Sequence, residues 1–228
     1  MVRVLSKSKS RLGECPVWDE RSERVFWVDI EAGRLFAATL DGAETIWDLP
    51  ERIGSFGLTT TTHVVVMALA SGFALYELER RALDRIPMRH DLGESVRFND
   101  GKCDPNGNFW AGAMSEKDPR QPDAHLYRLR PDLTIDVMLD GIRVSNSLAW
   151  SSDGARLFFA DSPTRTILSW ASPEANAMLG PAEIFAGPEV FRGVPDGSTI
   201  DADNRLWTAE WDGWRLLVHD RRGRLTKE

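Results

Sequence analysis

The feature that most constrains this chain of 228 residues is a sequence pattern that recurs along it. Each copy has an apolar segment, an Asp or Ser, a polar turn, two bulky residues and two short strands. Four copies are clear and a fifth, around Val66, is degenerate. Aligning Phe26, Val66, Phe109, Phe158 and Leu206 gives spacings of 40, 43, 49 and 48 residues. This period is typical of the four-stranded blades of a β-propeller.

The segments between turn signals predict strands, because they are short and rich in β-branched and aromatic residues. Turn signals include Asp41-Gly42 and Asn106-Gly107. Segments that are apolar on both faces fit blades packed between neighbouring blades. We therefore predict an all-β fold, a β-propeller of four-stranded blades forming a single domain over residues 1–228. An ordinary β-sandwich with accidental self-similarity is the alternative, but it gives no reason for this period.

The length of the chain limits the number of blades. After the first 13 residues, fewer than five blades of roughly 45 residues fit. We expect about five blades' worth of chain here, with the final blade or blades missing. Since a propeller closes its ring to protect its edges, a chain that did not close would aggregate instead of folding alone. Six tryptophans are expected in the core between blades: Trp18, Trp27, Trp110, Trp150, Trp170 and Trp207.

Composition and charge disfavour several classes of partner. The chain has 28 basic and 35 acidic residues, a net charge of −7. Binding to phosphate backbones or anionic membranes needs clustered Lys and Arg, so we expect neither nucleic acid nor a membrane as partner. No apolar run reaches the length of a membrane span, and no secretory signal is evident. We expect a cytoplasmic protein, a monomer or weak dimer, with Cys15 and Cys103 reduced.

Three polar residues occupy an equivalent position in their repeats, just before an inner strand: Glu14, Asn146 and Asp196. A propeller would bring such positions together around one axis. Each residue alone also fits a solvated loop or a turn. Two carboxylates and an amide oxygen are hard ligands that suit Ca²⁺, Mg²⁺ or Mn²⁺. No HExxH motif or His/Cys cluster signals a zinc site of soft ligands.

Four longer segments carry a family resemblance. They are LGECPVWDERSERVFWVDI, RFNDGKCDPNGNFWAGAM, VSNSLAWSSDGARLFFADS and VPDGSTIDADNRLWTAEW, covering about Leu12 to Trp211. In this order they resemble the senescence marker protein/gluconolactonase/regucalcin family. The resemblance implies a six-bladed propeller that hydrolyses sugar lactones with one divalent metal in its central channel. Ser147 departs from the family pattern, which has Gly at this position.

The resemblance also implies roles for individual residues. Glu14, Asn146 and Asp196 would hold the metal, with Ca²⁺ as the first expectation and Zn²⁺, Mg²⁺ or Mn²⁺ as alternatives. Arg97 and Asn99, which alternation places on one face of an extended segment, would bind the lactone. Glu116 is a weaker candidate for substrate contact. Within the same RFNDG segment, Asp100 and Gly101 are expected to form a turn.

The predicted reaction is hydrolysis of an aldonolactone, such as gluconolactone, to its aldonic acid. The metal would polarise the carbonyl and Asp196 would act as general base. Since a carboxylate bound to a cation is a weaker base, activation of water by the metal itself is a variant. A non-catalytic calcium-binding propeller and a related propeller phosphotriesterase are the alternatives. No GxSxG motif supports a serine hydrolase.

Overall fold

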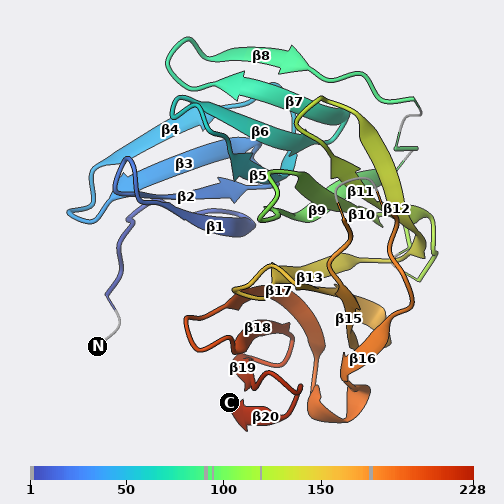
Figure 1. The fold of residues 1–228 in the computed structure, drawn as a ribbon. Coiled ribbons are helices and arrows are strands. Elements are labelled where there is room, and N and C mark those ends of the chain that lie inside the picture. Colours follow the sequence, from blue (N-terminus) through green and yellow to red (C-terminus); the bar gives the residue numbers. More distant parts are fainter. Residues whose placement is uncertain (1–2, 90–91, 94, 119, 175–176) are drawn as a thin grey trace. The chain divides into compact units, whose positions relative to one another are not determined.

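The described residues of the computed structural model are 3–89, 92–93, 95–118, 120–174 and 177–228. Their strands form five antiparallel sheets of four strands each, in which strands consecutive in the sequence are neighbours (Figure 1). Two short 3₁₀ helices, η1 (Ser162–Thr164) and η2 (Pro188–Val190), are the helical elements of this part of the chain. The predicted all-β class and the four-stranded blades are confirmed. No helix within the described ranges has the length and apolar character needed to cross a membrane.

The chain divides into two compact units, residues 1–92 and residues 93–228. The first unit contains two sheets. The first sheet consists of the strands β1 (Gly13–Asp19), β2 (Arg24–Asp29), β3 (Arg34–Thr39) and β4 (Glu44–Asp48). The second sheet consists of β5 (Ile53–Leu58), β6 (Val64–Leu69), β7 (Gly72–Glu77) and β8 (Ala82–Arg85). The second unit contains three sheets. The first of them consists of β9 (Val96–Cys103), β10 (Phe109–Ser115), β11 (Ala124–Leu129) and β12 (Ile135–Ile142), and the next of β13 (Ser145–Trp150), β14 (Arg156–Asp161), β15 (Ile167–Ala171) and β16 (Glu183–Ala186). The last consists of β17 (Val194–Ile200), β18 (Leu206–Trp211), β19 (Arg215–His219) and β20 (Leu225–Lys227).

The repeat found in the sequence corresponds to the sheets. The five residues aligned as equivalent all lie, buried, on the second strand of their sheet: Phe26, Val66, Phe109, Phe158 and Leu206. The first strands of successive sheets are neighbours within each unit. β5 lies beside β1, and in the second unit β13 lies between β9 and β17. Residues on the first strands of different sheets in the same unit are thereby brought close together.

An aspartate turn joins the first two strands in two of the sheets, at Asp104 and Asp201. In each, Oδ1 accepts hydrogen bonds from the main-chain N–H groups two and four residues further on, over 2.9–3.0 Å. Oδ2 accepts from an indole six residues further on, Trp110 Nε1 at 2.9 Å or Trp207 Nε1 at 2.8 Å. The Asp-to-Trp spacing that recurs in the sequence therefore reflects a hydrogen bond that stabilises the turn.

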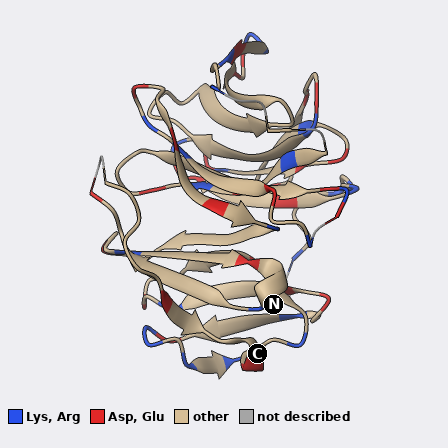
Figure 2. Ribbon diagram, turned by 90° about the vertical axis from the view of Figure 1, so that its right-hand side faces the viewer, with Lys and Arg blue, Asp and Glu red and all other residues tan. Residues whose placement is uncertain are grey.

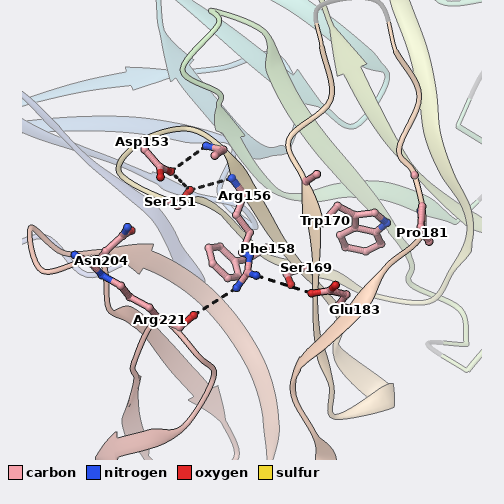
Figure 3. A pocket seen from close by; sticks show the side chains of 13 residues that line it. Ser151, Asp153, Arg156, Phe158, Ser169, Trp170, Pro181, Glu183, Asn204 and Arg221 are labelled. Atoms are coloured by element: carbon pink, nitrogen blue, oxygen red, sulfur yellow. Dashed lines mark hydrogen bonds and ion pairs between the residues drawn. The ribbon is translucent and has the colours of Figure 1, made fainter.

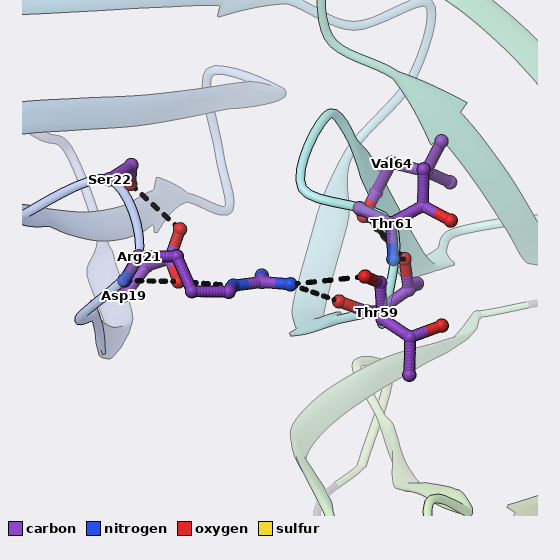
Figure 4. A network of polar contacts seen from close by, with 7 residues as sticks. Asp19, Arg21, Ser22, Thr59, Thr61 and Val64 are labelled. Carbon is purple, nitrogen blue, oxygen red and sulfur yellow. Dashed lines mark hydrogen bonds and ion pairs between the residues drawn. The ribbon is translucent and has the colours of Figure 1, made fainter.

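In the first unit, Arg21 links the turn after β1 to the chain that follows β5 (Figure 4). Its Nε donates to Asp19 Oδ1 at 2.9 Å, and its Nη1 donates to the carbonyl of Thr59 at 2.8 Å. Ser22 Oγ donates to the other carboxylate oxygen of Asp19 at 2.7 Å. Burial acts to raise the pKa of Asp19, but the hydrogen bonds from Arg21 and Ser22 outweigh it and lower the pKa. This network ties together the two sheets of the unit.

Each unit has its own apolar core. Phe26, Phe56 and Met67 belong to the core of the first unit. Phe158 and Leu217 belong to a core of the second unit. The charged residues lie mostly in loops and at strand ends, whereas the strand interiors are largely uncharged (Figure 2).

The tryptophan prediction is confirmed in part. Trp110, Trp150 and Trp170 are buried, and Trp27 and Trp207 are partly buried. Trp18 is 46% exposed, so its placement in the core was wrong. Neighbouring Val17 packs against the core of the first unit, and successive side chains of a strand point to opposite faces.

Candidate metal and substrate site

The three predicted metal ligands share one structural position. Glu14, Asn146 and Asp196 each lie at a β-bulge in the first strand of their sheet. The ladder between β13 and β14, for example, passes from Asn146 directly to Ala149. A bulge re-aims the side chains beside it, and bulges are common at functional sites. Glu14 belongs to the first unit and the other two residues to the second, so a single site for all three stays a prediction.

In the second unit, a chain of polar contacts joins four of the predicted site residues. Glu116 Oε1 lies 3.3 Å from Arg97 Nε. Arg97 Nη1 donates to Asn99 Oδ1 at 2.8 Å, and Asn99 Nδ2 donates to Asn146 Oδ1 at 3.2 Å. Arg97 and Asn146 are buried, with 8% and 7% of their surface exposed, whereas Glu116 is an exposed residue. The predicted substrate-binding residues of β9 and the predicted ligand of β13 thus form one connected group.

The same chain continues to the strand that carries Asp196. Asn146 Nδ2 donates to Ser162 Oγ at 2.9 Å, and Ser162 Oγ donates to the carbonyl of Pro195 at 2.7 Å. Ser162 begins η1 and is buried. Because the amide nitrogen of Asn146 is occupied by Ser162, its amide oxygen faces Asn99 and keeps a second lone pair.

Asp100 is a further candidate that the sequence analysis assigned to a turn. That assignment was wrong: Asp100 and Gly101 lie within β9, where Asp100 is at the bulge opposite Gly112 and Gly101 pairs with Ala111. The main-chain N–H of Leu148 donates to Asp100 Oδ2 at 2.9 Å. Burial raises the pKa of Asp100, and Lys102 and this hydrogen bond only partly offset the effect. The Asn-Asp-Gly string is a strong turn signal, and it hid the bulge.

Two acidic side chains therefore interact in this part of the molecule. Burial raises the pKa of Asp196, and the negative charge of Asp100 raises it further. A hydrogen bond from the main-chain N–H of Gly197 acts in the opposite direction. Like charges held together in a buried place disfavour ionisation, and a nearby cation reverses that effect.

The donor set of the second unit fits a hard divalent cation. Asp196 offers carboxylate oxygens, and Asn146 offers an amide oxygen whose orientation is fixed by Ser162. Among the described residues, no group of three or more His, Cys, Asp or Glu side chains is placed to hold a metal. Carboxylate and amide oxygens are ligands that Ca²⁺ and Mg²⁺ prefer.

A pocket of about 630 Å³ lies elsewhere in the second unit, and its lining includes none of the predicted site residues (Figure 3). Arg156 extends between its walls: Nη1 donates to the carbonyl of Arg221 at 3.4 Å, and Nη2 lies 3.9 Å from Glu183. The ring of Trp170 forms part of the wall. The predicted ligands Asn146 and Asp196 are at the bulges of β13 and β17 instead.

Comparison with known proteins decides the family. A family model described as the SMP-30/gluconolactonase/LRE-like region matches residues 12–228. The chain belongs to this family. The family resemblance predicted from the four sequence segments is thereby confirmed.

Relatives in the SMP-30/gluconolactonase/LRE-like family include sugar lactonases. The chain is 34% identical to an L-arabinolactonase of Azospirillum brasilense over 219 residues, which cover 94% of this chain and 72% of the relative. It is also 34% identical to a 6-deoxy-6-sulfogluconolactonase of Pseudomonas putida, covering 95% of this chain and 74% of the relative.

A solved structure supports the fold. The calcium-binding protein regucalcin of Agrobacterium tumefaciens superimposes with a TM-score of 0.91 at 24% identity. The match covers 99% of this chain and 76% of that structure. The predicted β-propeller fold is confirmed.

Proposed function

We propose that this family member hydrolyses a sugar lactone to its hydroxy acid in a reaction that depends on a divalent metal ion. The chain is an enzyme of the lactonase class, as its relatives named for lactone hydrolysis indicate. The observation that carries the proposal is the contact chain from Arg97 through Asn99 and Asn146 to the bulge of Asp196. It brings residues that could hydrogen-bond to a sugar together, on neighbouring strands, with oxygen atoms of the kind that bind metal ions.

Glu14, Asn146 and Asp196 would hold the metal, with Ca²⁺ as the first candidate. When bound, a divalent ion supplies the positive charge that polarises the ring-ester carbonyl of the lactone. The two negative charges of Glu14 and Asp196 would balance that of the cation. The interaction between Asp100 and Asp196 supports the assignment, because two neighbouring carboxylates favour a cation beside them.

The protein residues would carry out the remaining work. Asp196 would accept a proton from the water that attacks the lactone carbonyl carbon. The ring C–O bond then breaks, and the ring oxygen takes that proton back from Asp196 and leaves as a hydroxyl. Arg97 would donate hydrogen bonds to the ring oxygens and hydroxyls of the sugar. Asn99, whose two amide protons go to Ser145 and Asn146, would accept a hydrogen bond from a sugar hydroxyl through its amide oxygen. Glu116 would hold the Arg97 guanidinium in position and contact substrate only at the edge of the site.

Binding of calcium without catalysis is the second candidate. The structural similarity to a protein described as calcium-binding supports it. The same oxygen ligands would serve both functions, so the second candidate predicts metal binding with no turnover.

Lactone hydrolysis after metal removal tests the proposal. The chain would be chelated and then supplied with Ca²⁺, Mg²⁺, Mn²⁺ or Zn²⁺ and D-glucono-1,5-lactone, and acid release would be compared with the spontaneous rate. Pentonolactones and an organophosphate triester would be assayed in parallel. We expect one or more metals to restore lactone turnover. Metal binding without turnover of any lactone would favour the calcium-binding function, and turnover of the triester alone would favour a phosphotriesterase.

A further inference from the structure

Ser147 adopts a backbone conformation that is unfavourable for a side chain with a Cβ atom. It follows Asn146 at the bulge of β13 and has φ +60°, in the left-handed region. Glycine adopts this conformation without the steric penalty. Ser147 is also completely buried, so its hydroxyl must be hydrogen-bonded to be tolerated. What the serine adds over a glycine here is that hydroxyl.

The hydroxyl of Ser147 belongs to a chain of three hydroxyl groups whose direction is fixed. Ser147 Oγ lies 2.6 Å from the main-chain carbonyl oxygen of Asp196, which only accepts, so Ser147 donates its single proton there. Ser198 Oγ therefore donates to Ser147 Oγ, at 3.0 Å. Thr208 Oγ1, 2.8 Å from Ser198 Oγ, must then be the donor to Ser198. The hydroxyl protons of these three residues therefore all point along the hydrogen bonds toward Asp196.

The carbonyl held by Ser147 belongs to the same peptide group as the N–H of Gly197. A trans peptide is planar and its C=O and N–H point in opposite directions, so fixing one fixes the other. The Cα atom that bears the Asp196 side chain lies in the same plane, so fixing this peptide group also limits where the side chain can lie. The hydroxyl of Ser147 thus acts, through one rigid peptide group, on the position of the Asp196 side chain.

A second tie reinforces the first. Ser162 Oγ donates to the carbonyl of Pro195 at 2.7 Å and accepts from Asn146 Nδ2. Two successive carbonyls of β17, those of Pro195 and Asp196, are therefore held from the neighbouring sheet. The two residues of β13 involved, Asn146 and Ser147, are adjacent, so the two bulges are joined at two points.

We propose that Ser147 is a positioning residue that holds the Asp196–Gly197 peptide, and with it the Asp196 carboxylate, in register with Asn146. The inference rests on the proposed function for the role of Asp196 but not for the geometry. Ser198 donates to Ser147, and Thr208 donates to Ser198. The loss of metal affinity expected on removing each hydroxyl therefore decreases in the order Ser147, Ser198, Thr208.

The test compares Ser147→Ala and Ser147→Gly with the wild type and with Ser151→Ala. Ser151 is a matched control, because its buried hydroxyl serves a turn of the same sheet, donating to Asp153 Oδ1 at 2.6 Å. For each protein, calcium affinity would be measured by calorimetry after chelation, together with kcat and KM for gluconolactone. Exchange of the Gly197 amide proton, followed by NMR, reports on the peptide without any ligand.

We expect both Ser147 variants to bind Ca²⁺ about tenfold more weakly and to lose roughly 10- to 100-fold in kcat, the range found when supporting partners of a metal site are removed. KM should change much less, and Gly197 exchange should become faster. Ser147→Gly, relieved of the unfavourable φ, should remain at least as stable as Ser147→Ala. The control should match the wild type.

Folded Ser147→Gly protein with wild-type Gly197 exchange would overturn the inference, whatever the activity. So would wild-type calcium affinity and kcat in both variants. If the wild type itself neither binds Ca²⁺ nor hydrolyses lactone, the proposed function fails, while faster exchange of Gly197 in the variants would still support the positioning role of Ser147.

Discussion

The side-chain amide of Asn99 on β9 donates to the amide oxygen of Asn146 on β13 over 3.2 Å. The same nitrogen also donates to the carbonyl of Ser145 at 3.0 Å, and Arg97 donates to the oxygen of Asn99. Asn99 is thus oriented by three contacts and in turn orients Asn146. A predicted substrate-binding residue and a predicted metal ligand are coupled through a single hydrogen bond.

Replacing Asn99 by Asp should disrupt this coupling. The new carboxylate would have no proton to donate and would face the oxygens of Asn146 and Ser145, so both hydrogen bonds would be lost. We expect kcat/KM for a lactone substrate to fall roughly 100-fold, the scale of a small misplacement in an active site. Asn106→Ala, in the exposed turn between β9 and β10, should leave it unchanged. Equal rates for the two variants would contradict the predicted role of Asn99.

Replacing Gly112 by Ala should destabilise the second unit. A Cβ atom at this position would overlap the side chain of Ser145 on β13. Overpacking of this kind costs about 1–3 kcal/mol, and the displaced β13 carries Asn146 with it. We expect a lower free energy of unfolding in urea together with reduced activity. Gly180→Ala is the control, because its Cβ would meet no atom within 4 Å. Equal free energies of unfolding for the two variants would contradict the predicted overlap at Gly112.

His219 should make stability depend on pH. The residue is fully buried beside Phe185 and Phe191, and within the described part of the chain its ring nitrogens have no hydrogen-bond partner. Burial lowers its pKa, and the charge of Asp220 offsets this only in part. Unfolded His has a pKa of about 6.5, so below that pH the unfolded chain binds a proton that the folded chain does not. The free energy of unfolding should therefore fall as the pH decreases below about 6.5.

Urea unfolding at pH 7.5 and pH 5.5 measures this effect. Carboxylates with lowered pKa values, such as Asp19 and Asp29, also lose their stabilising effect in acid, but the wild type and the variant His219→Leu both contain them. His219→Leu should show the smaller loss between the two pH values. An identical loss in the variant and the wild type would exclude His219 as a source of the pH dependence.

The sequence repeat was sufficient to predict the architecture, because each sheet repeats the same arrangement of strands and turns. Asp104 and Asp201 make matching hydrogen bonds to Trp110 and Trp207, so the repeated letters correspond to a repeated structure. The shared position of Asn146 and Asp196 was predicted for the same reason. Both lie within the inner strand of their sheet, at its bulge, and not just before the strand as predicted.

Other features depend on contacts between sheets, which no local pattern contains. Asp100 belongs to a string that ordinarily forms a turn, yet Leu148 of the adjacent sheet holds it within a strand. Ser147 appeared only as a departure from a glycine, and its partners Asp196 and Ser198 are about 50 residues away in the sequence. Trp18 is apolar, but alternation places it on the outer face of β1.

The most direct test of the central claim is the rate of lactone hydrolysis by Asp196→Asn with Ca²⁺ present. The variant keeps the shape of the side chain but removes both the predicted metal-binding carboxylate and the proposed base. We predict that kcat/KM falls by about 10²–10⁴, the contribution expected of a general base. Asp132→Asn, at an exposed turn of the second unit, should retain wild-type activity. Wild-type hydrolysis by folded Asp196→Asn would contradict the account.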